Sequence, residues 1–288
     1  MKRMGTARIR KLEEAIFRAL MFASLAIVFA GLAGIVFVII LRGASSLHLS
    51  MILKSPEGSY YLGGGGGVAN AIVGSLCLAF GATLLSFFLS LPIAFALQKE
   101  YVGPRLARLT TLSLDILWGI PSIVYGAFGF IVMLYFGLSA SMLGGIIALT
   151  FLMLPIMTRS IDEVIRIIPR DLKEASYALA ATRAETSSLV VWRQALPGIV
   201  TAILLAFGRG IGDTASILFT AGYTDSIPRS LFDPVASLPL AIFFQISTPI
   251  PEVQQRAYAS ALILLAIVVL ISTGTRLLGR RYSRHILR

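Results

Sequence analysis

The chain has 288 residues, of which 57% are hydrophobic and only 14% are charged. Its mean hydropathy of +0.85 lies outside the range of ordinary soluble domains and predicts an integral membrane protein. The formal net charge of +11 would suggest a nucleic-acid partner for a soluble chain, so the placement of the basic residues decides whether that partner is excluded.

Apolar stretches long enough to cross a bilayer recur along the chain, since about 20 helical residues span a ~30 Å hydrocarbon core. The first follows basic residues as in a signal peptide, but it exceeds the usual length of about 7 to 15 residues, so we expect an uncleaved helix. Pro121 and Pro155 lie inside spans and predict kinks. The six predicted spans are 16–41, 68–97, 109–134, 142–157, 198–222 and 257–278.

These spans predict an all-α membrane protein. We expect a cytoplasmic N-terminal segment at 1–15, a transmembrane domain at 16–278 and a basic cytoplasmic tail at 279–288. With the N-terminus in the cytoplasm, twenty Lys and Arg residues fall on cytoplasmic segments and four on external ones, while Arg209 remains inside a span. This asymmetry follows the positive-inside rule and predicts that both termini are cytoplasmic. The net positive charge therefore reflects the orientation of the chain in the membrane. We expect membrane lipid, but no nucleic acid, as a partner.

Two external loops have distinct compositions. Residues 63–67 are five consecutive glycines, which we interpret as a flexible hinge or loop, because no helix N-terminus of the P-loop kind follows them. The 223–256 loop is half apolar and rich in proline. This composition predicts that the loop contains a partly folded element that faces outward.

The longest cytoplasmic loop, 158–195, has a helical pattern with two amphipathic pieces separated by Pro169. Asp171, with Glu174 three residues later, forms an N-cap signature of the capping-box type. The pattern fits either an ordinary surface helix or a helix that a partner binds.

The segment "DLKEASYALAATRAETSSLVVWRQALPGI" in this loop resembles the EAA loop of ABC-importer permeases, whose pattern is Glu-Ala-Ala, three residues, Gly and a later Leu-Pro pair. Ser176 stands in the place of the second alanine, and Ala180 in the place of the glycine. The resemblance implies that residues 158–197 include a coupling helix that inserts into a groove of a cytoplasmic ATPase. The coupling residues that it implies are Asp171, Glu174, Ala175, Ser176 and Ala180.

Further segments resemble the phosphate permeases among these importers. "LWGIPSIVYGAFGF" is similar to a segment of their third span, and "GRGIGDTASILFTAG" to their Ala-Arg-Ala-Ile-Gly-Glu-Thr-Ala-Pro-Leu-Leu-Phe-Thr-Ala stretch, with Asp213 for the glutamate and Ser216 for the proline. The Leu-Phe-Thr-Ala end is typical of the PstA type. The resemblance implies a permease subunit in a bacterial inner membrane that carries inorganic phosphate. Its implied partners are a second permease of the PstC type, an ATP-binding dimer of the PstB type and an external phosphate-binding protein of the PstS type.

Arg209 and Asp213 lie four residues apart within the predicted span 198–222 and should share one helix face. An ionisable residue at the centre of a membrane helix costs about 2.5–3.5 kcal/mol, so it faces a partner or a water-filled path. Two interpretations remain open. The two residues neutralise each other as a structural pair, or Arg209 offers its planar fork to phosphate while Asp213 weakens the attraction. In the second case the substrate path is Arg209, Asp213 and Thr214.

Other classes of function have little support. No lysine follows a glycine, so the chain has no Walker A motif, and its two histidines, His48 and His285, lie far apart in the sequence. We expect no catalytic residue, no metal and no cofactor. Asp115 is interpreted as solvated or paired with Arg108. The alternatives are a permease for another oxyanion, such as sulfate, molybdate or phosphonate, and an ion-coupled secondary transporter.

Overall fold

The computed structural model describes residues 2–58 and 60–282, with side chains described for 10–58 and 60–277. Within these ranges the regular structure is helical apart from one isolated β-bridge, Pro56 to Gly66, so the all-α prediction is confirmed. Residue 1 of the predicted N-terminal segment and residues 283–288 of the predicted tail lie outside the described residues. The elements are α1 (Lys2–Ala44), α2 (Leu49–Leu53), the 3-10 helix η1 (Tyr60–Leu62), α3 (Ala69–Ala96), α4 (Pro104–Gly119), α5 (Ser122–Tyr135), α6 (Met142–Ile167), α7 (Arg170–Ala178), α8 (Arg183–Glu185), the π-helix η2 (Thr186–Val191), α9 (Trp192–Ile211), α10 (Leu238–Ile246) and α11 (Pro251–Tyr282).

Five helical runs are long and apolar enough to cross a membrane, and the bent pair α4 and α5 makes a sixth if it counts as one span. The six predicted spans therefore correspond to five continuous runs and one broken one. The continuous runs are Arg10–Ala44, Ala69–Ala96, Met142–Ile167, Arg183–Ile211 and Pro251–Leu277.

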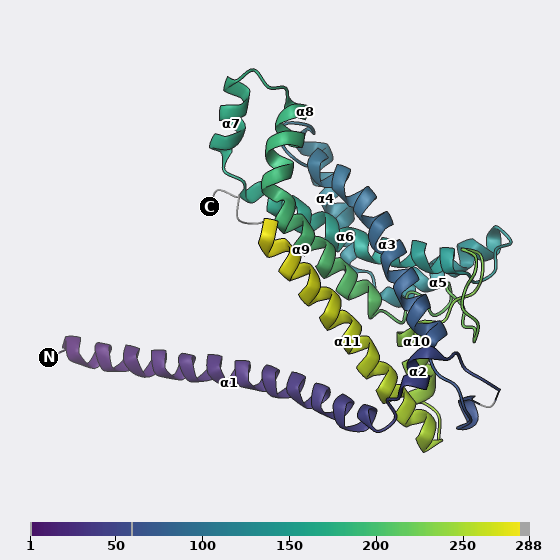
Figure 1. Ribbon diagram of the computed structural model, residues 1–288. Coiled ribbons are helices and arrows are strands. Elements are labelled where there is room, and N and C mark those ends of the chain that lie inside the picture. Colours follow the sequence, from purple (N-terminus) through teal and green to yellow (C-terminus); the bar gives the residue numbers. More distant parts are fainter. Residues whose placement is uncertain (1, 59, 283–288) are drawn as a thin grey trace.

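Helix α6 forms the centre of the bundle and packs against α3 and α9 (Figure 1). Its Met153 and Ile161 are fully buried. Glycines on α9 allow the close approach: a Cβ on Gly198 would come within 2.4 Å of Val164, and one on Gly210 within 2.5 Å of Met153. Close contact of small residues stabilises helix pairs in lipid, where apolar burial offers little driving force.

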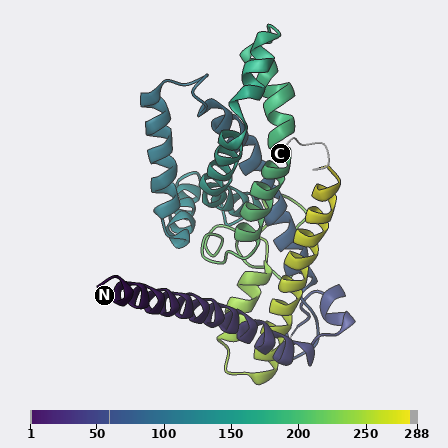
Figure 2. The ribbon, with the colours of Figure 1, turned by 90° about the vertical axis from the view of Figure 1, so that its left-hand side faces the viewer.

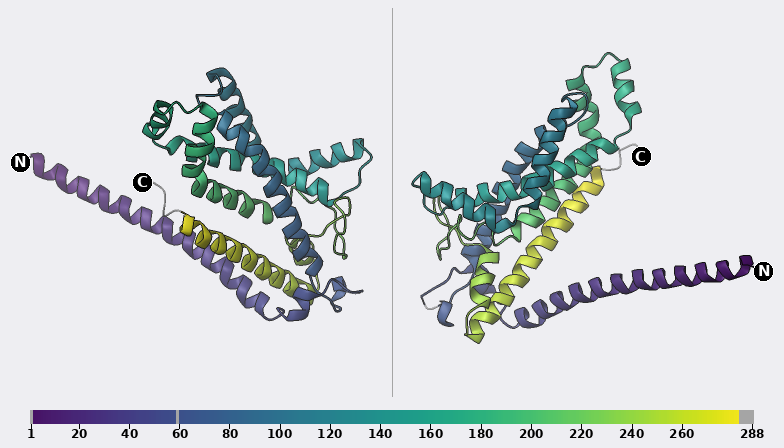
Figure 3. Two further views of the ribbon diagram at one scale, coloured as in Figure 1. Left: turned by 45° about the horizontal axis from the view of Figure 1, so that its top comes forward. Right: turned by 180° about the vertical axis from the view of Figure 1, so that it is seen from behind.

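Helix α1 diverges from the bundle, and two further views show it leaving at an angle to α11 (Figure 3). The most apolar window of α1 contains no buried residue. Its C-terminal end is the part that packs on α11, where a Cβ on Gly43 would lie 2.6 Å from the carbonyl oxygen of Tyr258. Arg42 also donates a hydrogen bond of 3.2 Å to the Tyr258 hydroxyl. Helix α1, which is long and exposes an apolar surface, is thus attached to the bundle at its C-terminal end.

The kink predicted at Pro121, within the span 109–134, is a sharp break, because α4 and α5 meet at an angle of 99°. Ile120 between them is extended, with φ −73° and ψ 128°. Pro121 disfavours a helical conformation of the residue before it, so the chain turns there rather than kinking. Figure 2 shows α4 standing at one side of the bundle and turning into α5. By contrast, Pro155 lies inside a continuous α6.

The boundaries of the fourth and fifth spans also differ from the prediction. Helix α6 continues to Ile167, ten residues past the predicted end, and Pro169 then limits it. Helix α9 ends at Ile211 instead of continuing to residue 222, and residues 213–221 form turns. These turns are buried against α5, where a Cβ on Gly126 would lie 2.7 Å from the Ala215 carbonyl oxygen. Non-helical backbone at membrane depth is tolerated where protein covers it.

The two loops predicted to be external form a folded cap. The side chain of Arg256 donates to the carbonyl oxygens of Tyr60, Gly63 and Gly64 at 2.7, 2.9 and 2.6 Å, and its guanidinium lies 4.6 Å from the Tyr60 ring centre. Of the predicted hinge or loop, the glycine run is therefore a loop that Arg256 holds in place through Gly63 and Gly64. Burial, opposed by the charge of Arg256, raises the pKa of Tyr60 to about 12. In the 223–256 loop, the buried helix α10 confirms a partly folded element.

Candidate functional site

Arg209 and Asp213 form an ion pair at the C-terminal end of α9. Arg209 Nη1 lies 3.4 Å from Asp213 Oδ1, and the exposed fractions of the two side chains are 49% and 4%. A single contact at this length is not the two-pronged arrangement that arginine makes with a carboxylate when the pair is fully engaged. Much of the Arg209 guanidinium therefore remains available to another anion.

The two charges do not share one helix face, because α9 ends between them. Gly212 caps the helix, and Asp213 begins the following turn. Asp213 Oδ2 accepts hydrogen bonds from the Ser216 backbone N–H at 2.8 Å and from its hydroxyl at 2.6 Å. This is the geometry of an aspartate that caps a turn, with its acceptor oxygen bonded three residues ahead. Ser216 is a site residue that the sequence interpretation missed, although the Asp-x-x-Ser spacing carried the signal.

The turn that holds Asp213 is itself anchored. Ser216 is fully buried, and its carbonyl oxygen accepts from Thr220 Oγ1 at 3.0 Å. The Ser141 N–H at the start of α6 donates to the Thr220 carbonyl oxygen at 2.8 Å. Thr214, the third predicted path residue, is half-buried beside Asp213 in the same turn. The structure thus brings all three predicted path residues together, with the acid held by Ser216 and the arginine half-exposed.

The predicted coupling residues lie on α7 and just beyond it. Asp171 is in the first turn, and Asp171, Glu174 and Ala175 are exposed. The predicted capping box at Asp171 and Glu174 is wrong, because Pro169 occupies the N-cap and makes no side-chain cap. The capping box forms instead at the start of α8, between Thr182 and Glu185. Helix α7 projects with α8 from one end of the bundle (Figure 1).

Ala180, just after α7, has a conformation that favours glycine. Its φ is +60°, and it is the one non-glycine residue with positive φ in the described part of the chain. The Ala180 N–H donates to Tyr177 O at 2.9 Å and the Ala181 N–H to Ser176 O at 3.2 Å, which is the Schellman pattern. The bend of the glycine-containing loop is therefore kept with an alanine in its place.

We expect Ala180→Gly to stabilise this end of α7 by about 1 kcal/mol, because a Cβ in the left-handed region is strained. The measurement is hydrogen exchange of the α7 amides, which should slow about five-fold. Ala178→Gly, inside the helix, is the matched control and should speed exchange. Equal exchange in Ala180→Gly and the native chain would contradict the strain.

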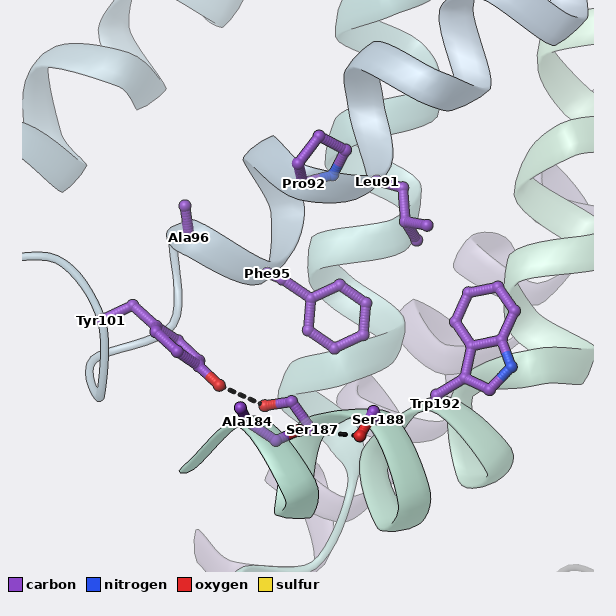
Figure 4. A pocket seen from close by; sticks show the side chains of 9 residues that line it. All are labelled: Leu91, Pro92, Phe95, Ala96, Tyr101, Ala184, Ser187, Ser188 and Trp192. Carbon is purple, nitrogen blue, oxygen red and sulfur yellow. Dashed lines mark hydrogen bonds between the residues drawn. The ribbon is translucent and has the colours of Figure 1, made fainter. Parts of the chain in front are cut away.

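A set of contacts joins α7, α8 and η2 to the segment that follows α3. Lys173 Nζ lies 3.2 Å from Glu100 Oε1, and Arg183 Nη1 donates to the Glu100 carbonyl oxygen at 2.6 Å. The Tyr101 hydroxyl contacts Ser187 Oγ at 2.7 Å, at the edge of an apolar cavity of about 690 Å³ between α3 and η2 (Figure 4). Sequence analysis missed Glu100, since nothing in a single sequence pairs it with a residue 73 positions away.

Glu100 is held in its ionised form. Although burial opposes ionisation, its own backbone N–H, the hydrogen bond from Lys173 and the charges of Lys173 and Arg183 keep its pKa below the ordinary value. The side chains of Lys173 and Glu100 are only 14% and 30% exposed. The contact between α7 and the segment after α3 therefore remains an ion pair at neutral pH.

Two further carboxylates have partners that the sequence did not reveal. Asp115 pairs with Arg159 of α6 rather than with Arg108. Asp162, 3% exposed, accepts from Gln98 Nε2 at 3.0 Å and from Arg166 Nε at 2.9 Å. Both pairs lie away from Arg209 and tie α6 to its neighbours. Across the described residues, no group of three or more His, Cys, Asp or Glu side chains is placed to hold a metal ion.

The fold and these sites define a polytopic helical membrane protein with a buried charged turn and a helix, α7, that projects from one end of the bundle. Residues 86–286 match the family described as the binding-protein-dependent transport system inner membrane component, and the chain belongs to this family. It is therefore a multi-pass inner-membrane component of a transport system.

Individual relatives give a more specific comparison than the family as a whole. The chain is 33% identical over 277 residues to phosphate transport system permease protein PstA 1 of Mycobacterium tuberculosis (strain CDC 1551 / Oshkosh), covering 93% of this chain and 89% of that protein. It is 36% identical over 219 residues to phosphate transport system permease protein PstA of Mycobacterium leprae (strain TN), covering 75% and 70%. The inward-facing MetNI methionine ABC transporter superposes with a TM-score of 0.63 at 20% identity, over 75% of this chain and 96% of that chain, which supports the fold alone.

Proposed function

We propose that the chain is a PstA-type permease subunit of an ATP-driven importer that carries inorganic phosphate into the cytoplasm. The proposed partners are a second permease of the PstC type, a PstB-type ATPase dimer and a PstS-type external binding protein. The relatives named as phosphate permeases support the substrate. The observation that carries the proposal is the half-exposed Arg209, engaged by its acid through one contact of 3.4 Å.

The geometry suits an anion that must bind and then leave. A phosphate crossing a low-dielectric region needs positive charge, but a site that is too attractive does not release it. Asp213 supplies a fixed negative charge beside Arg209 that lowers the attraction without filling the arginine's fork. Thr214 adds a hydroxyl in the same turn.

The energy would reach this path through α7. We propose that the ATPase holds the exposed residues around Glu174, and that α7 passes its movement to α3 through Lys173 and Glu100 and to α9 through η2. A rigid-body shift of these linked helices then alternates access to the path. We also propose that both termini are cytoplasmic, as the distribution of basic residues indicates.

The test is radiolabelled phosphate uptake in a bacterial strain that lacks its own PstA-type subunit and receives this chain with partner subunits from the same source. Uptake that requires ATP hydrolysis and resists excess sulfate supports the proposal. An assembled complex that takes up sulfate, molybdate or phosphonate but not phosphate identifies a different oxyanion importer. Uptake that persists without the ATPase subunit identifies a secondary transporter.

The same assay tests the connection between α7 and α3. We expect Glu100→Lys to lower the phosphate carried per ATP hydrolysed about ten-fold, because it places two like charges in contact. The double change Glu100→Lys with Lys173→Glu restores the ion pair and should restore coupling. No recovery in the double variant would assign Glu100 a role other than pairing.

A further inference from the structure

We infer that Ser216 is a positioning residue of the anion path, which keeps Asp213 from closing on Arg209. The inference rests on the proposed function for its effect on transport. The restraint of Asp213 itself rests on the geometry of the site. Asp213 Oδ2 accepts hydrogen bonds from the backbone N–H and the hydroxyl of Ser216, while Oδ1 faces Arg209.

Ser216 and Arg209 compete for the carboxylate of Asp213. A free aspartate beside arginine turns both oxygens toward the guanidinium and forms two parallel hydrogen bonds. Here the serine hydroxyl bond of 2.6 Å and the backbone bond of 2.8 Å fix the carboxylate plane, and the arginine contact is limited to 3.4 Å at one oxygen. Ser216 therefore determines how much of the Arg209 charge remains for a substrate.

The surroundings make the restraint effective. Ser216 and Thr220 are fully buried, and a Cβ on Gly126 of α5 would lie 2.8 Å from the Ser216 carbonyl oxygen. The backbone of the turn is thus pressed against α5 and cannot follow a moving carboxylate. Arg209, at 49% exposure, is the member of the three that a substrate or reagent can reach.

The first test measures the reactivity of Arg209 directly. The full-length chain is purified from membranes with its co-purifying subunits and treated with phenylglyoxal, and modification of Arg209 is followed by peptide mass spectrometry. We expect Ser216→Ala to slow this modification about five-fold, because loss of one hydrogen bond frees the carboxylate to engage the guanidinium. Ser260→Ala, which also removes a buried hydroxyl, is the matched control and should leave the rate unchanged.

A double-mutant cycle separates positioning from general support of the fold. In an Asp213→Asn background the side chain carries no charge to pair with Arg209, so Ser216→Ala should no longer slow the modification. An equal effect of Ser216→Ala in both backgrounds, or no effect in either, would overturn the inference.

The second test measures transport. In the assembled importer we expect Ser216→Ala to raise the KM for phosphate about five-fold and to change the maximal rate less, because it weakens capture rather than the ATP-driven step. If Ser216→Ala slows the modification of Arg209 as expected but the native chain takes up no phosphate, the proposed function is refuted and the role of Ser216 stands. Phosphate uptake by the native chain with an unchanged Arg209 reactivity in Ser216→Ala would refute the inference alone.

Discussion

Arg209→Ala lowers phosphate uptake by about 10- to 100-fold while the amount of chain in the membrane stays normal. The size of the effect follows from removing charge-assisted hydrogen bonds to the anion, each about 1.5–3 kcal/mol. The buried Asp213 also loses its neighbouring positive charge and repels phosphate. Arg209→Lys should retain part of the uptake, since an ammonium supplies charge without the planar fork.

Radiolabelled uptake in the assembled importer measures this result, with Arg229→Ala as the control. Arg229 is exposed and lies in the 223–256 loop, so its loss removes the same charge away from the path. The double variant Arg209→Ala with Asp213→Ala distinguishes the two interpretations. Recovery of uptake in that variant would mean that the residues serve only to neutralise each other.

Glu174→Arg should remove the ATPase from the purified chain, with a loss of about ten-fold or more in the ATPase recovered. Glu174 is exposed on α7, and a reversed charge at the centre of a docking surface costs several kcal/mol through like-charge contacts. Co-purification followed by quantitative immunoblotting measures the loss.

Glu163→Arg provides the matched control for this experiment. Glu163 is equally an exposed acid, but it lies on α6 outside the projecting helix. If both variants retain the ATPase, α7 is an ordinary surface helix and the nucleotide-binding partner contacts another surface. If both lose it, the effect is one of net charge rather than of position.

The sequence was sufficient for the membrane class and for the approximate place of every span, because composition and length alone decide those. It was insufficient where a single residue redirects the chain. Pro121 and Pro155 carry the same local signal, yet one lies where two helices meet at 99° and the other lies within one continuous helix. Their surroundings differ, since α6 packs extensively against both α3 and α9, whereas α4 and α5 pack chiefly against α6.

The candidate site shows the same limit at finer scale. The four-residue spacing of Arg209 and Asp213 indicated a pair, and the pair exists, but the expected shared helix face assumed that the helix continues through Gly210 and Gly212. Glycines weaken a helix, and an aspartate three residues before a serine favours a capped turn. These local signals are consistent with the end of α9 at Ile211, which the hydrophobicity of the segment did not indicate.

The contact of α1 with α11 places the first and the last helix of the chain side by side. During synthesis, α1 enters the membrane while the residues that will receive Gly43 are more than two hundred positions from being made. Its docking point is completed when α11 follows, so this part of the architecture closes last. Until then lipid surrounds α1 on all sides. The apolar, exposed surface of α1 is compatible with that environment.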